Sequence, residues 1–190
     1  MGVFLVVLSY LIGSVPVGYL LGRLKGVDIR LHGSGNIGAT NVWRTLGPAA
    51  GATALVLDVL KGLLPVLLGR GVGGEVLALL CGLAAIAGHS WSVFLGFRGG
   101  KIIATSLGVF LALSPLAALL ALGIWLAVVF LSGYVSLGSI VAAASMPLLM
   151  LALHQPWSYV LFSLVTAAVA VYKHVPNIRR LLAGTEPKIR

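Results

Sequence analysis

The sequence predicts an all-α integral membrane protein with seven transmembrane helices, its N-terminus outside and its C-terminus in the cytoplasm, built as a single membrane domain over residues 1–190. The first observation is composition: 59% of the residues are hydrophobic and 9% are charged, with a mean hydropathy of +1.10. A soluble domain carries about 25% charged residues, so this chain could not cover a water-facing surface. The second observation is that the apolar residues come in blocks of about the length of a transmembrane helix.

The clear apolar blocks cover residues 3–22, 51–69, 76–95, 137–153 and 157–172. Residues 102–131 are also apolar, and a single helix of that length would run about 45 Å across a hydrocarbon core of about 30 Å. Pro115 cannot continue the preceding helix, so this stretch is expected to divide into a short fourth helix, 102–114, and a fifth. The first block is expected to be retained, because no basic residue precedes it and it has no A-x-A cleavage site.

The placement of basic residues selects seven helices and sets their direction. With the uncharged N-terminus outside, every Lys and Arg except Arg70 and Lys61 falls in the cytoplasm, in agreement with the positive-inside rule. Six helices would instead move the basic tail outside. The net charge of +9 favours anionic lipid headgroups and anionic substrates. It does not indicate nucleic acid, because the basic residues are not interleaved with exposed aromatics.

Four polar segments interrupt the apolar pattern, and this topology brings all of them to the cytoplasmic side. They are "GSGNIGATNVWR" (33–44), "GHSWSVFLGFRGGK" (88–101), "SGYVSLGS" (132–139) and "YKHVPNIRR" (172–180). The corresponding loops are expected near residues 23–50, 96–101 and 132–136, with a tail over 173–190. Their convergence on one face predicts a binding site there.

The chemistry of the first two segments favours a phosphate site. Glycines allow positive φ and close backbone approach, and successive N–H groups in such turns bind anions. Arg44, Arg98 and Lys101 add positive charge, and Ser34 adds a neutral donor. The expected phosphate-binding residues are Gly33, Gly35, Asn36, Gly38, Thr40, Asn41, Arg98, Gly99 and Gly100.

Each of these features has a plainer interpretation as well. The first loop is also compatible with a flexible connection in which Thr40 or Asn41 caps a helix that begins near Val42. The segment "FRGGK" is compatible with an interfacial turn that carries positive-inside charges. Asn177 could simply cap a short helix that ends before Gly184.

Buried charges and histidines are the remaining candidates. Asp58 and Lys61 share a helix face and are expected to pair, because inserting a lone Lys at mid-membrane costs on the order of 3 kcal/mol. The pair is either structural or a charge near the substrate. His89 is either a hydrogen-bonding group at a helix end or catalytic, and Glu186 is expected to be peripheral.

The residues that are missing narrow the reaction. The four carboxylates are too few and too scattered for a Mg²⁺ site, and the single Cys81 cannot form a cysteine metal site, so we expect no metal and no cofactor. The pattern H-x-x-x-x-D and the G-x-S-x-G nucleophile elbow are both absent. A membrane enzyme of this kind suits a substrate that is already activated.

The motifs "GSGNIGATNVWRTLG", "GHSWSVFLGFRGGK", "VSLGSI" and "KHVPNIRRLL" resemble those of the bacterial PlsY family, the glycerol-3-phosphate acyltransferases that use acyl phosphate. The resemblance implies a seven-helix enzyme of the bacterial inner membrane with its site facing the cytoplasm. It implies acyl transfer from acyl phosphate to the 1-hydroxyl of glycerol 3-phosphate, giving lysophosphatidic acid and phosphate. The implied partners are these substrates, membrane lipids and an upstream enzyme that forms acyl phosphate. The implied functional residues are Ser34, Arg44, Lys101, His174 and Asn177.

The chain departs from the family pattern "FKGGKGVAT" by reading "FRGGKIIAT", so that Ile102 stands where the pattern has glycine. Ser92 stands where the family often has proline. The base that accepts the glycerol proton is either His174 or a phosphate oxygen of the substrate. Two other classes are a transporter of a phosphorylated anion and a structural membrane subunit. The enzyme hypothesis requires segments 33–44 and 96–101 to lie on the same side of the bilayer and close enough to share one ligand.

Overall fold

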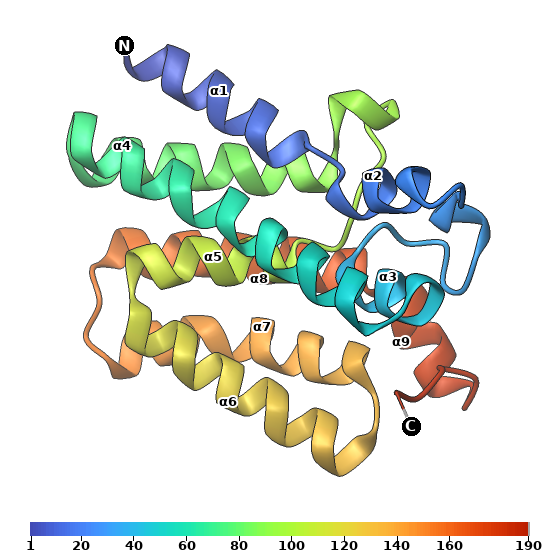
Figure 1. Cartoon of the computed structure of the whole chain (residues 1–190). Coiled ribbons are helices and arrows are strands. Elements are labelled where there is room, and N and C mark those ends of the chain that lie inside the picture. The colour runs from blue at the N-terminus through green and yellow to red at the C-terminus, as the bar shows by residue number, and fades with distance from the viewer. Residues whose placement is uncertain (190) are drawn as a thin grey trace. The chain divides into compact units, whose positions relative to one another are not determined.

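The structure, a computed structural model, describes residues 1–189 and is built from helices (Figure 1). It divides into two compact units, one from Met1 to Ala112 and one from Leu113 onward, and each is described by itself. Within the described residues, extended pairing is limited to one isolated bridge between Ser92 and Arg98. The predicted all-α class is therefore confirmed.

The first unit begins with a broken helix. α1 (Gly2–Ser14) and α2 (Val17–Leu24) are separated at Val15 and Pro16 and bend by 42°. Pro16 has no N–H to continue the ladder, which explains why the single block predicted over residues 3–22 divides here. The chain then passes through η1 (Ile29–Leu31) and α3 (Ala39–Leu46).

α4 (Pro48–Ser90) contains both the second and the third predicted spans. Its helical geometry is interrupted at Gly73, with φ −144°, and at Gly74, with φ 70°. The chain doubles back at this point, so that Gly69 lies against the backbone of Leu77 and Ala78 (Figure 1). A left-handed residue is easiest for glycine, and this is why the turn occurs at Gly74.

Small residues let the helices of the first unit approach closely. Gly13 of α1 lies against the Ala85 carbonyl of α4, and Gly88 lies against the Tyr10 carbonyl, with no room for a Cβ atom at either glycine. Gly62 makes the same kind of contact with Thr105 of α5 (Ile103–Leu113). Close backbone packing of this kind is typical of membrane helices. η2 (Val93–Leu95) connects α4 to the loop before α5.

The second unit contains α6 (Pro115–Ser132), α7 (Val135–Ala152), α8 (Trp157–Lys173) and α9 (Val175–Leu182). α6 begins at Pro115, so the break expected there is confirmed. α6 and α7 run side by side, and Trp125 Nε1 donates to Ser139 Oγ across them at 3.2 Å (Figure 1). α8 turns into α9 with a bend of 56°.

Three helices of the described chain are long and apolar enough to cross a membrane, namely α4, α6 and α7. The bent pairs α1 with α2 and α8 with α9 each meet the same criterion together, and α5 is a shorter apolar helix. The membrane class of the protein follows from these helices. The seven spans and their direction stay predictions.

Candidate functional site

The first glycine-rich loop runs from η1 to α3. Gly33 and Gly35 have φ values of 57° and 69°, so the expected left-handed turns are present at these two positions. Gly38 has φ −74°, so the expectation of positive φ is wrong there. It is the N-cap of α3, and its N–H donates to Asn36 Oδ1 at 2.9 Å. Because α3 begins at Ala39, the alternative in which Thr40 or Asn41 caps a helix near Val42 is also wrong.

Asn41 holds this loop together from inside. Its side chain is buried, and its Oδ1 accepts a hydrogen bond from the Ser34 N–H at 2.9 Å. Its Nδ2 lies 3.0 Å from the Ile29 carbonyl, 3.1 Å from that of His32 and 2.8 Å from that of Asn36. The sequence predicts that Asn41 contacts phosphate. Its amide is instead committed to the loop, so we assign it the role of shaping the loop.

Two of the exposed residues in this region are Ser34, in the loop, and Arg44, in α3. Arg44 lies in the last turn of α3, and Thr40 is half-buried in its first turn. A serine and an arginine are therefore exposed on and beside a loop that is held by its own hydrogen bonds. Both groups are donors suited to phosphate oxygens.

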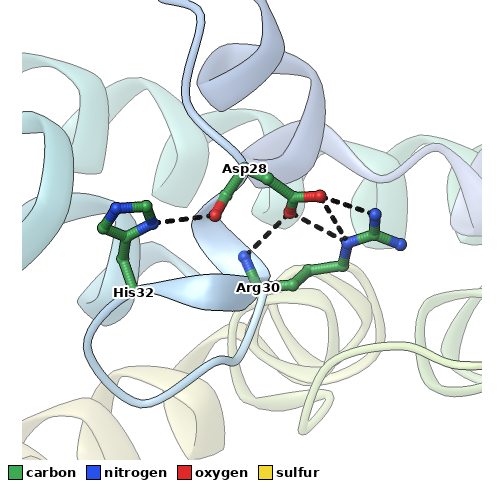
Figure 2. Close-up of polar contacts among 3 residues, drawn as sticks. All are labelled: Asp28, Arg30 and His32. Atoms are coloured by element: carbon green, nitrogen blue, oxygen red, sulfur yellow. Dashed lines mark hydrogen bonds and ion pairs between the residues drawn. The ribbon is translucent and has the colours of Figure 1, made fainter.

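Three polar residues just before the loop, Asp28, Arg30 and His32, are linked by hydrogen bonds (Figure 2). Asp28 accepts hydrogen bonds from the Arg30 backbone N–H at 3.0 Å and from Arg30 Nε at 2.9 Å, and pairs with Arg30 Nη2 at 2.6 Å. The side-chain bond from Arg30 lowers the pKa of Asp28 to about 2. His32 Nδ1 donates to the Asp28 carbonyl at 2.9 Å. The charge of Arg30 is thus compensated by Asp28.

The second loop, residues 96–102, follows η2. Its left-handed residues are Gly96, Phe97 and Ile102, with φ values of 61°, 60° and 65°. Neither Gly99 nor Gly100 has a positive φ, so the conformational reason that we expected for these two glycines is wrong. Glycine is needed at both positions because there is no room for a Cβ atom. Gly99 lies against the backbone of His89 and Ser90, and Gly100 lies against the His89 imidazole.

Ile102 combines a left-handed backbone with a fully buried, β-branched side chain. This is an uncommon combination, because the branched Cβ crowds the backbone at positive φ. The resemblance places a glycine at this position, and the backbone still has the conformation that suits glycine. Burial of the isoleucine side chain holds it there, directly beside Lys101.

The two loops share one hydrophobic base in the first unit. Ile37 of the first loop and Val42 of α3 belong to a buried cluster, and Leu95, the last residue of η2 before the second loop, packs against it. The other members of the cluster are Val17, Ile29, Ala50 and Ala54. Segments 33–44 and 96–101 therefore adjoin the same buried cluster of the first unit.

The second unit carries its own polar group at the α8–α9 bend. His174 is buried, and its Nδ1 lies 2.7 Å from the Ala170 carbonyl. A carbonyl only accepts, so Nδ1 donates to it, and in the neutral form of the imidazole the lone pair lies on Nε2. Asn177 is buried inside α9, so it does not cap that helix. Gly184, with φ 68°, follows the C-cap Ala183, as expected for the end of this helix.

Glu186 is the centre of this group, and the expectation that it is peripheral is wrong. Its Oε1 accepts hydrogen bonds from Ser136 Oγ at 2.7 Å and from Asn177 Nδ2 at 2.6 Å. Its Oε2 accepts one from Arg180 Nε at 2.7 Å. Burial raises the pKa of Glu186, but the three hydrogen bonds together lower it by more than burial raises it. The net pKa of Glu186 therefore lies below its usual value. No local sequence pattern marks Glu186, because its partners come from α7 and α9.

The fold and these polar groups define a class: an integral membrane protein of packed helices with glycine-rich, basic loops suited to an anionic ligand. Among residues 1–189, His, Cys, Asp and Glu side chains do not gather in groups of three or more that could hold a metal. Residues 3–184 match the family model described as glycerol-3-phosphate acyltransferase. The chain belongs to this family.

Relatives and solved structures agree with this assignment. The glycerol-3-phosphate acyltransferase of Desulforudis audaxviator is 60% identical over 95% of this chain and 92% of its own length. Glycerol-3-phosphate acyltransferase 2 of Moorella thermoacetica is 56% identical over 96% and 95%. The crystal structure of PlsY in its glycerol 3-phosphate form is 42% identical, covers 100% of this chain and 96% of its own, and has a TM-score of 0.97. The lysophosphatidic acid form of PlsY is 41% identical over 100% and 95%, with a TM-score of 0.94.

Proposed function

We propose that this protein transfers a fatty acyl group from acyl phosphate to the 1-hydroxyl of sn-glycerol 3-phosphate, giving 1-acylglycerol 3-phosphate and phosphate. The observation that carries the proposal is the likeness over the whole chain to PlsY structures in glycerol 3-phosphate and lysophosphatidic acid forms. These two ligands are the acceptor and the product of such a reaction.

The proposed topology has seven spans. They are the bent pair α1–α2, the two halves of α4, and α5, α6, α7 and α8. With the N-terminus outside, the glycine-rich loops and the tail face the cytoplasm, where the basic residues lie. This orientation suits an enzyme of the bacterial inner membrane that meets a water-soluble acceptor at the cytoplasmic surface. A separate enzyme that forms acyl phosphate would supply the donor.

The first unit is proposed to hold the phosphate groups. Arg44 is suited to grip phosphate oxygens with two parallel hydrogen bonds, and Lys101 to act as a point charge. Arg98, which is exposed three residues before Lys101, adds to the positive potential of the second loop. Backbone N–H groups around Gly33 and Gly35 and the Ser34 hydroxyl complete the donor set.

Acyl phosphate suits this set of residues as the donor. It is a mixed anhydride with phosphate as leaving group, so orientation and charge stabilisation are the main requirements. The glycerol oxygen attacks the acyl carbon and forms the ester C–O bond. The bond between that carbon and the phosphate oxygen breaks, and phosphate leaves with the electron pair. Arg44 and Lys101 stabilise the charge on the departing phosphate.

His174 is proposed as the base for the glycerol hydroxyl. Its Nδ1–H is bound to the Ala170 carbonyl, which fixes the tautomer with the lone pair on Nε2. Asn177 is proposed to hydrogen-bond the substrate, and Glu186 holds its amide. The alternative, in which a phosphate oxygen takes the proton, remains open to test.

The test is a direct assay of the purified protein in lipid. Palmitoyl phosphate and glycerol 3-phosphate should give equal amounts of phosphate and lysophosphatidic acid, and palmitoyl-CoA should not replace palmitoyl phosphate. Turnover with palmitoyl-CoA alone would contradict the proposed donor. Passage of glycerol 3-phosphate into sealed vesicles without acyl transfer would contradict the enzyme and favour a transporter.

A further inference from the structure

A pair of opposite charges lies deep inside the first unit. Asp58 and Lys61, one turn apart on α4, are 2% and 6% exposed, and Lys61 Nζ lies 2.8 Å from Asp58 Oδ1. Both are outside the glycine-rich loops, and neither has a part in the proposed reaction. A buried ion pair is weak evidence for stability alone, because well-packed apolar residues often do as well. The pair therefore calls for another explanation.

Lys61 also binds the break between α1 and α2. Its Nζ donates to the Val15 carbonyl at 2.9 Å, at the point where Pro16 interrupts the helix. α2 then packs beneath the first loop, where Gly18 lies against the Ile37 carbonyl and Val42. Lys61 thus fixes the element on which the first loop rests.

Asp58 lies close to His89, the residue against which the second loop packs. Its Oδ1 lies 3.8 Å from Nδ1 of the buried His89. The His89 carbonyl accepts the Gly100 N–H at 2.9 Å, and the His89 imidazole fills the space beside Gly100. Gly99 and Gly100, directly before Lys101, therefore both pack against His89.

We propose that Asp58, Lys61 and His89 form a positioning network that fixes the position of one glycine-rich loop relative to the other. The network would thereby set the spacing between Arg44 and Lys101. The network runs from the Val15 carbonyl through Lys61 and Asp58 to His89. It rests on the proposed function, because it serves the grip on phosphate. The three residues act through the loops and are not expected to touch the substrate.

The experiment separates positioning from stability by comparing single and double variants of the full chain. Asp58→Asn and Lys61→Met each leave one buried charge without its partner, so both are expected to lower the Tm. The double variant Asp58→Leu/Lys61→Met replaces the pair with apolar side chains and is expected to regain most of the Tm. Its kcat/KM for glycerol 3-phosphate is nevertheless expected to stay about 10- to 100-fold below that of the wild type. Wild-type kinetics in the double variant would overturn the proposal.

A distance measurement tests the network without relying on activity. Spin labels are attached through Leu31→Cys and Phe94→Cys, both exposed positions, in a Cys81→Ala background. Cys81→Ala is also the matched control, because Cys81 is buried in α4 away from the network, and it should keep wild-type kinetics. The label distance should be narrowly distributed in this background and broader in the double variant.

The two readouts distinguish the two proposals. A narrow distance that broadens in the double variant, in a protein that shows no acyl transfer, supports the network and refutes the proposed function. An unchanged distance in the double variant refutes the network, whatever the activity. If the double variant does not fold, His89→Asn, which shortens the side chain beside Gly100, provides the same comparison and is expected to broaden the distance.

Discussion

The Gly100 N–H donates to the His89 carbonyl at 2.9 Å, and the His89 imidazole lies where a Cβ atom on Gly100 would be. This contact holds the loop that contains Lys101 against the end of α4. The glycine is thus required by its neighbour and not by its own φ angle.

Gly100→Ala should displace the second loop, because the added methyl group collides with a buried ring. We expect turnover to fall about 100-fold, as it does when a catalytic group is misplaced by about 1 Å. Gly71→Ala is the control, since nothing lies within 4 Å of a Cβ at Gly71. Acyltransferase assays of both purified variants check this, and a Gly100→Ala enzyme with normal turnover would contradict the contact.

Arg44→Ala should abolish turnover while leaving the protein folded, because the exposed Arg44 guanidinium is the group proposed to grip substrate phosphate. Arg44→Lys should recover only part of the activity, since an ammonium cannot make the same two parallel hydrogen bonds. Arg23→Ala removes another exposed basic residue and serves as the control. Steady-state kinetics would disprove the assignment if Arg44→Ala kept near-normal kcat/KM.

His174→Asn distinguishes the two candidate bases. The Asn amide can still donate to the Ala170 carbonyl, as Nδ1 does, but it has no counterpart of Nε2. If His174 is the base, kcat should fall about 10²- to 10⁴-fold with little change in the KM for glycerol 3-phosphate. A variant that keeps most of its kcat would instead favour a phosphate oxygen of the substrate as the base.

At position 102, the glycine variant should be more stable than the alanine variant, which is the reverse of the order expected inside a helix. Ile102→Ala and Ile102→Gly lose nearly the same buried side chain, but only glycine relieves the left-handed backbone at φ 65°. Ile102→Gly should therefore be more stable than Ile102→Ala by about 1 kcal/mol. The order should be opposite at Ile86, which is buried inside α4, where glycine is the poorer residue. Thermal unfolding of the four variants in detergent checks this, and equal stabilities at position 102 would refute it.

Glu186 should make the second unit sensitive to acid. Its folded pKa lies below the ordinary value of 4.5, so its stabilising effect is complete above pH 4.5 and is lost as the pH falls through the lower folded value. Glu186→Gln should cost about 2 kcal/mol at neutral pH, because it places an amide donor among three donors. It should also remove this part of the acid dependence, which Tm measurements between pH 3 and 7 would reveal. Parallel curves for the wild type and the variant would count against it.

Candidate residues could be found in the sequence because their types are unusual in an apolar chain. Glycines, Ser34, Arg44 and Lys101 stand out between apolar blocks, and Pro115 marks a helix boundary by its own covalent geometry. What each residue does was harder to predict. Asn41 appeared to be a ligand donor and proved to be the centre of its loop, because carbonyls several residues away in the chain surround it. Glu186 appeared peripheral and proved to hold Asn177 and Arg180, since only folding brings the tail back to α7.

The sequence by itself determined the membrane class, the helical segments and the polar segments, because hydropathy, proline and glycine act locally along the chain. Only the tertiary structure decided why Gly99 and Gly100 are glycines, that Ile102 adopts a left-handed backbone, and that Asp58 and Lys61 lie between the break after α1 and His89. These properties depend on which atoms fill the space around a residue. That is set by the packing of distant segments, which no local pattern encodes.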